Sequence, residues 1–431
     1  MISQSIRTLE SSFLGMLIVF VTIFSFTPII DRAIILLGLE ALFLFVIFSQ
    51  IGNSQYALNS RLTMSVILYL AVCVSYKLLN ISSLLSGQLV IHVFFFIAIL
   101  VMLLIPCIIT NKQSEVLVWL IVGVVVFNII DNIRLCILYP EVALAVNRDS
   151  EFEYLGINIG SSRFYNGVFF FYTVCLFGFL NLKKKVIKFL MLVAAGTAAV
   201  FILGFCLKAS VFVFFILATF LLILGRRAKS FKSFFFRIAI PSLVAFFLVS
   251  EFTNEIIEFI TKSFPSERLA SRLIYLIDSD SAASGAEATV KAREELGMVS
   301  LRTWTDNIVN FFVGIGDHRV IWGEQSAASS GIGQHAEFLD SLARYGLIGF
   351  FLLWNILYGS FKYITRLFDQ RYFIQLQIIF LLFILFGLSK GVFFPNIGVV
   401  LFLFLPLFSK IMKMENIHNE TYMSDFVRQR E

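Results

Sequence analysis

The sequence predicts an all-α polytopic membrane protein with about 12 transmembrane helices and one large, outward-facing helical loop before the tenth span. Three observations predict this class. The chain is 59% hydrophobic and 14% charged, with a mean hydropathy of +0.89, whereas a soluble domain carries roughly 25% charged residues. Its apolar residues form runs of about 20, the length that crosses a hydrocarbon core of ~30 Å. One long polar interval, the 95 residues 251–345, interrupts these runs and holds fourteen of the 28 acidic residues.

The apolar runs justify the spans in turn. Nine precede the polar interval and three follow it: 12–30, 33–49, 62–79, 89–109, 117–138, 166–182, 186–206, 209–225, 235–250, 346–361, 372–388 and 397–412. No small-residue cleavage site follows the first run, so we expect a retained span. The predicted organisation is nine transmembrane helices in 1–250, the outward loop in 251–345, three more helices in 346–413 and a cytoplasmic tail in 414–431.

The distribution of Lys and Arg predicts the orientation, because short cytoplasmic loops are enriched in both. With the termini inside, the short inside segments hold nineteen Lys and Arg, and the short outside segments hold five. Both termini are therefore expected in the cytoplasm, with loop 251–345 outside. The basic clusters then act as membrane anchors, which accounts for the net charge of +6, and we expect no nucleic-acid partner.

Several kinds of chemistry are disfavoured. All five cysteines lie in or at the edges of predicted spans, so the loop offers no disulfide framework and no zinc site. Asp278 and Asp280 are too sparse for a calcium site, and no Walker-type phosphate loop is present. We expect neither a metal nor a cofactor. The absence of an internal repeat disfavours a transporter built from inverted repeats.

Ionisable residues gather near the predicted outer ends of several spans. Placing an ionisable side chain there costs free energy unless it faces the bundle interior or a water-filled cavity. These residues are Lys77, His92, Asp131, Arg134, Arg163, Lys208 and Lys390. Some of these side chains could instead extend toward the outer headgroups. The remaining cations would form a basic pocket that opens outward and suits an anionic lipid head such as a pyrophosphate.

The end of the polar interval contains the most distinctive residues. A helix is expected to start near Gln334 and to continue straight into the tenth span, with His335 in its first turn. A neutral imidazole there could act as a general base, although an interfacial histidine that only packs is an open alternative. His318 follows the bend at Gly314 and Gly316 and is less distinctive.

The residues after His335 have supporting roles in this interpretation. Asp340 and Arg344 are four residues apart, and a pair along one helix face is expected. Glu337 could orient a group in the site or only solvate the helix. Upstream, the run 308–313 is apolar enough to lie in the membrane interface.

Two stretches resemble a known family. The run Phe311-Phe312-Val313-Gly314-Ile315-Gly316 is followed, after a gap, by Gly333-Gln334-His335-Ala336-Glu337-Phe338-Leu339-Asp340-Ser341-Leu342-Ala343-Arg344-Tyr345-Gly346-Leu347-Ile348-Gly349. Together they are similar to the O-antigen polymerase and O-antigen ligase superfamily of polytopic bacterial glycosyltransferases. The specific part of the resemblance covers about 60 residues before the tenth span, and its spacing fits most of the chain.

The resemblance implies a GT-C-like, metal-independent transfer of glycan from undecaprenyl pyrophosphate. It implies a catalytic role for His335, which matches the family's loop histidine. It also implies arginines that hold the pyrophosphate. Arg293 and Arg302 both stand upstream of the Gly-x-Gly, and both remain candidates. Lys208 stands where the family has an arginine, which puts its equivalence in doubt, and Arg163 is an independent candidate.

The expected function is polymerisation of lipid-linked repeat units into O-antigen or capsular polysaccharide at the outer face of the bacterial cytoplasmic (inner) membrane. Donor and acceptor would both be glycans on undecaprenyl pyrophosphate, and a chain-length regulator protein is a possible partner. Two alternatives stay open. A ligase would transfer finished glycan to a lipid A core in lipopolysaccharide synthesis, and a transporter or flippase would move lipid-linked glycan. The long loop and the lack of internal symmetry argue against the transporter.

Overall fold

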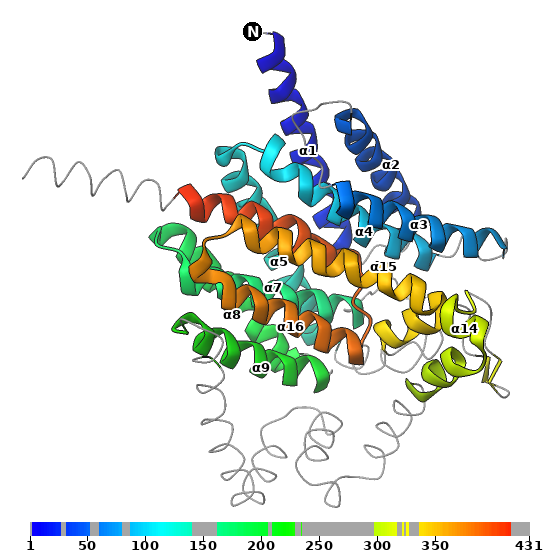
Figure 1. Cartoon of the computed structure of the whole chain (residues 1–431). Coiled ribbons are helices and arrows are strands. Elements are labelled where there is room, and N and C mark those ends of the chain that lie inside the picture. The colour runs from blue at the N-terminus through cyan, green and yellow to red at the C-terminus, as the bar shows by residue number, and fades with distance from the viewer. Residues whose placement is uncertain are drawn as a thin grey trace, which may run out of the picture.

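A computed structural model describes residues 2–26, 32–51, 60–79, 87–139, 162–205, 209–228, 234, 297–316, 321–322, 325–326 and 336–414. The described elements are helices apart from two short paired strands (Figure 1). Its elements are α1 (Ile2–Phe26), α2 (Arg32–Ile51), α3 (Ser60–Leu79), α4 (Gly87–Ile108), α5 (Asn111–Leu138), α7 (Ser162–Asn181), α8 (Lys185–Phe205), α9 (Ala209–Arg226), α14 (Ile308–Phe312), β1 (Ile321–Trp322), β2 (Gln325–Ser326), α15 (Glu337–Leu367), the 3₁₀ turn η3 (Gln370–Tyr372), α16 (Phe373–Ser389), α17 (Pro395–Gly398) and the π-helical η4 (Val399–Phe404).

The helices have the lengths and compositions of a polytopic membrane protein. Among the described residues, six helical segments are long and apolar enough to cross a membrane, and five shorter apolar helices accompany them. Eleven of the predicted runs coincide with helices, and the run 235–250 lies outside the described residues. The coarse prediction of a helical multi-pass membrane protein is therefore confirmed.

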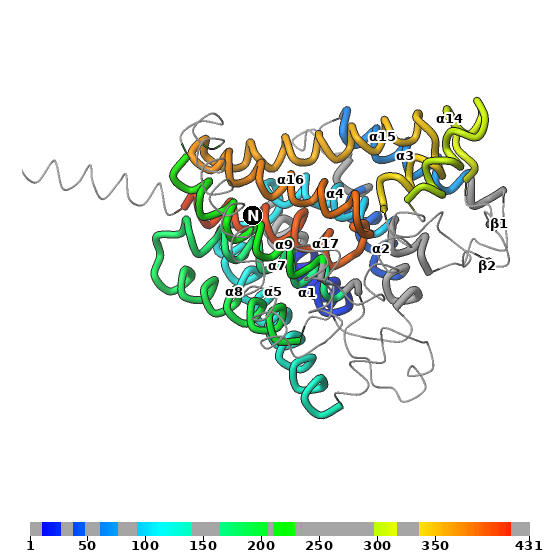
Figure 2. The backbone as a smooth tube through the Cα atoms, turned by 90° about the horizontal axis from the view of Figure 1, so that it is seen from below, coloured from blue at the N-terminus to red at the C-terminus, as the bar shows by residue number. Residues whose placement is uncertain are grey.

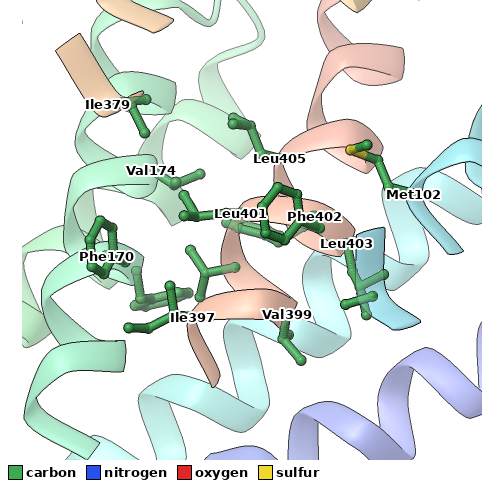
Figure 3. Close-up of a cluster of buried hydrophobic side chains, with 14 of the residues drawn as sticks. Met102, Phe170, Val174, Ile379, Ile397, Val399, Leu401, Phe402, Leu403 and Leu405 are labelled. Atoms are coloured by element: carbon green, nitrogen blue, oxygen red, sulfur yellow. The ribbon is translucent and has the colours of Figure 1, made fainter. Parts of the chain in front are cut away.

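Aromatic packing builds the centre of the bundle. The runs Phe94–Phe96 and Phe169–Phe171 are fully or almost fully buried. Phe170 meets Phe383 and Phe386 of α16 at ring-centroid distances of 6.0 and 5.6 Å. Around them, side chains of α4, α7, α16, α17 and η4 interdigitate (Figure 3). These two phenylalanine runs thus act in packing between helices.

A few hydrogen bonds between helices fix their register. Asn181 of α7 donates its side-chain amide to Gln375 of α16 at 2.9 Å, and Gln375 donates to the main-chain oxygen of Leu222 in α9 at 3.2 Å. The hydroxyls of Tyr172 and Thr219 join α7 to α9 at 2.7 Å. Such bonds disfavour other alignments of these helices, because shifting one helix along another would leave buried polar groups without hydrogen-bond partners.

The polar interval is described only from residue 297. Residues 297–305 are helical, and Asn307 caps α14 by accepting the N–H of Asn310 at 2.9 Å. Strands β1 and β2 pair antiparallel, with Ile321 opposite Ser326. The part of the loop from 251 to 296 lies outside the described residues.

One expectation about α15 is wrong. The helix begins at Glu337, after the N-cap residue Ala336, and does not run straight into the membrane segment. Gly346 adopts φ 61° and ψ −170°, which kinks the helix. We call the part before the kink, Glu337–Tyr345, the lead-in segment. The residues around Gly346 favour a helix, so the sequence does not predict this kink. Only the left-handed φ of Gly346 in the structure shows it.

Candidate functional site

The lead-in segment carries three buried ionisable residues. Glu337, Asp340 and Arg344 are only 6%, 2% and 6% exposed. Their spacing of three and four residues puts them on one face of the helix. We call them the buried charged group. Ionised side chains are seldom this buried unless they are paired or hydrogen-bonded, so their neighbours define the candidate site.

Each acid of the buried charged group has a distinct partner. The Ser300 hydroxyl donates to Oδ1 of Asp340 at 2.5 Å, which ties the helical residues 297–305 to α15. The main-chain N–H of Val392 donates to the Glu337 carboxylate. Arg344 attracts Glu337 electrostatically, whereas Asp340 repels it. Arg344 thus offsets the charge of Glu337, and different parts of the chain hold the two acids in place.

Aromatic contacts hold the lead-in segment against the membrane helices. Tyr345 meets Tyr69 of α3 edge-to-face, with ring centroids 5.6 Å apart. The charges of Glu337 and Arg344 also act on Tyr69. Phe338 packs so tightly on α16 that a Cβ at Gly387 would lie 2.4 Å from its ring. The lead-in segment is therefore wedged between α3 and α16.

The kink at Gly346 is stabilised by the Gly-x-Gly motif of the loop. A kink there removes the helical partners of the Ala343 and Arg344 carbonyls, which must find other donors when buried. The N–H groups of Ile315 and Gly316 supply them, at 3.1 and 2.8 Å. The loop thus substitutes for the missing turn of the helix.

Glycine is required on both sides of this contact. Gly314 has φ 83°, and a Cβ there would lie 2.3 Å from the Arg344 carbonyl oxygen. Gly346 has φ 61°, and a Cβ there would lie 2.4 Å from the Phe312 carbonyl carbon. Main chain meets main chain here, so neither side can accept a side chain. We call this contact between residues 312–316 and 343–346 the glycine lock.

The connection between α16 and α17 joins the site to α7. Asn166 donates its side-chain amide to the main-chain oxygen of Gly391 at 3.2 Å. A Cβ at Gly391 would lie 3.3 Å from Oε2 of Glu337. The stretch 390–394, which begins with Lys390, therefore lies between the start of α7 and the lead-in segment. Arg163 belongs to the first turn of α7, three residues before Asn166.

The structure places four of the predicted site residues. Glu337, Asp340 and Arg344 come together, and Arg302 is exposed on the helical residues 297–305. The side chain of Arg163 lies outside what is described, as do Lys208, Arg293, His318 and His335. His335 immediately precedes the N-cap residue Ala336 in the chain.

Two of the charged residues predicted near the outer end of the fifth span lie near the C-terminal end of α5 and are exposed. Asp131 and Arg134 of α5 pair with each other at 3.7 Å, with side chains 41% and 71% exposed. They face outward from the bundle, as the alternative of side chains extending toward headgroups requires.

Sequence reasoning missed Ser300, Tyr69, Asn166 and Val392. Ser300 and Tyr69 have no local signal, because a serine in a polar loop and a tyrosine in a span are both ordinary. Asn166 stands three residues after Arg163, and the nearness of this polar residue to a candidate site residue could have pointed to it. Val392 contributes only a main-chain N–H, which every residue except proline has, so its residue type gives no signal.

Comparisons with known proteins give no family for this chain: no family model matches it, and no curated protein matches it. Within the described residues, no group of three or more His, Cys, Asp or Glu side chains could hold a metal ion.

The buried charged group and the glycine lock together form a charged anchor at the start of a membrane helix. This anchor holds the chain directly after His335 in place.

Proposed function

We propose that this protein is a membrane glycosyltransferase that polymerises undecaprenyl-pyrophosphate-linked repeat units into O-antigen or capsular polysaccharide. The observation that carries the proposal is the buried charged group, which the glycine lock and Ser300 hold directly after His335. A membrane protein with one rigid, charged anchor at the start of a span is suited to a substrate whose reacting group sits beside the bilayer.

The proposed reaction is a displacement at the anomeric carbon of the donor sugar. A hydroxyl oxygen of the acceptor unit forms a bond to that carbon, and the bond from carbon to pyrophosphate oxygen breaks. His335 takes the hydroxyl proton, and the pyrophosphate leaves with the bonding electron pair. Arg163, Arg293 or Arg302, together with Lys208, would stabilise the negative charge that develops there.

The buried charged group has a positioning role in this proposal. Glu337 follows His335 by two residues and is held by Val392 and Arg344. A general base must stay within hydrogen-bond reach of the proton that it removes, so a fixed main chain beside it favours reaction.

The proposal also includes twelve spans, cytoplasmic termini and an outward loop. The excess of Lys and Arg in the short inside segments supports this topology.

Deleting the gene in its host and resolving the surface glycan on a gel tests the proposal. The deletion strain is complemented with the wild-type chain, with His335→Ala, or with His418→Ala as a matched histidine control in the C-terminal tail. We expect the deletion and His335→Ala to leave core plus one repeat, and His418→Ala to restore the ladder.

Other patterns would contradict the proposal. Loss of all core-attached repeats, with long glycan retained on the lipid carrier, would indicate the ligase. An unchanged ladder in the deletion strain would indicate that the protein is a transporter or that it acts on an unrelated substrate. Normal polymer from well-expressed His335→Ala would remove the catalytic role of His335.

A further inference from the structure

The short helix α14 turns its apolar side chains away from the protein. Ile308, Val309, Phe312 and Val313 are 74%, 61%, 44% and 45% exposed. A helix that packs on a protein in water shows the opposite pattern, with its apolar side inward. The outward side of α14 therefore suits an apolar surrounding.

The inward side of α14 carries Asn310 and Phe311, which contact the helical residues 297–305. The Asn310 side chain donates to the main-chain oxygen of Thr303 at 3.2 Å, and the Trp304 indole donates to that of Phe311 at 2.9 Å. The rings of Trp304 and Phe311 stack 4.7 Å apart. These contacts hold α14 on the helical residues 297–305 with its apolar side chains pointing outward.

The glycine lock sets the depth of α14 relative to the membrane segment of α15. The main chain at Phe312 and Val313 lies directly against Gly346, and α14 packs beside the first turns of α15 at the edge of the bundle (Figure 2). Immediately after Gly346 come Leu347, Ile348 and Phe351, which are 39%, 57% and 63% exposed.

The exposed apolar side chains of α15 continue along its membrane segment with Trp354 and Tyr358. On a helix that is apolar enough to cross a membrane, such a stripe faces lipid. Because the main chain of Phe312 and Val313 lies against Gly346, which directly precedes Leu347 and Ile348, the exposed apolar side chains of α14 stand at the start of the lipid-facing stripe.

We propose that α14 is seated in the bilayer, with Ile308, Val309, Phe312 and Val313 among the acyl chains of the leaflet in which α15 enters. An element seated in this way lies at the boundary of headgroups and acyl chains. The glycine lock then holds the buried charged group at the same depth. Resting on the proposed function, this depth lets a lipid-linked substrate reach the site without leaving its leaflet.

Spin labels measure the depth of α14 directly. Val309→Cys, Asp306→Cys and Phe351→Cys are each labelled in a background without native cysteines. The proteins are reconstituted in vesicles of phosphatidylethanolamine and phosphatidylglycerol. Collision with apolar oxygen and with a water-soluble nickel chelate is then compared. Asp306 is the matched control, because it is exposed on the residues just before α14, and Phe351 is the lipid-facing reference.

We expect the label at 309 to collide preferentially with oxygen, as at 351, and the label at 306 to prefer the nickel chelate. A label at 309 that matches 306 would place α14 in water and overturn the inference. A label at 309 shielded from both reagents would show that protein covers α14, which also overturns it. Ile308→Cys gives an independent measurement where Val309→Cys does not fold. No activity is measured, so the result stands whatever His335→Ala does to the glycan.

Discussion

Two groups of acid and arginine side chains behave differently in this protein. Asp131 and Arg134 on α5 are exposed and lie 3.7 Å apart, whereas Asp340 and Arg344 on α15 are buried beside Glu337. The residue types and helical spacings are nearly the same. What differs is the surroundings: α5 turns its pair outward, and the loop, α3 and α16 enclose the other group. Burial makes the same charges a structural requirement, because a buried charge without its partner is far more costly than an exposed one.

The largest effect is expected from removing the cation of the buried charged group. Arg344→Ala removes the cation that attracts the buried Glu337 carboxylate and should destabilise the protein by about 3–5 kcal/mol. Thermal unfolding in detergent measures the loss. Arg134→Ala is the matched control and should leave the midpoint unchanged, because an exposed pair contributes little. Equal midpoints for the two variants would show that burial does not separate the two groups.

A somewhat smaller effect is expected from breaking the glycine lock. Gly346→Ala forces a Cβ into the left-handed region and against the main chain of Phe312, at a cost of at least about 2 kcal/mol. Gly123→Ala in α5 is the control, since a Cβ there meets nothing within 4 Å. That control should be neutral or stabilising, because alanine favours the helix. Similar stability of the two variants, measured by the same unfolding assay, would contradict the lock.

The smallest of these effects is expected at Ser300. Ser300→Ala removes the hydroxyl that donates to Asp340 and should destabilise the protein by about 1–3 kcal/mol, because a buried acceptor loses its donor. Ser75→Ala is the control, since its exposed hydroxyl donates only to Ala71 one turn earlier. Limited proteolysis gives a second measurement: faster cleavage within 297–316 in Ser300→Ala alone would confirm that Asp340 holds this part of the loop.

The sequence predicted the parts of the fold that depend on composition. Apolar runs determine which segments enter a membrane, because the hydrocarbon core excludes any chain that is polar over that length. Eleven such segments are helices in the structure. The Gly-x-Gly motif and the residues after His335 also stood out in the sequence, since glycine and charge are unusual beside a span.

The tertiary structure alone decided how these motifs work. Nothing in the sequence shows that Gly346 is left-handed, that Ile315 and Gly316 donate to the carbonyls that it frees, or that Val392 supplies a main-chain donor to Glu337. These contacts join residues far apart in the chain through backbone atoms that every residue type shares. Composition therefore determined that this is a membrane protein with one polar loop. Only the tertiary packing, through main-chain and side-chain contacts, decided that Glu337, Asp340 and Arg344 are buried while Asp131 and Arg134 remain exposed.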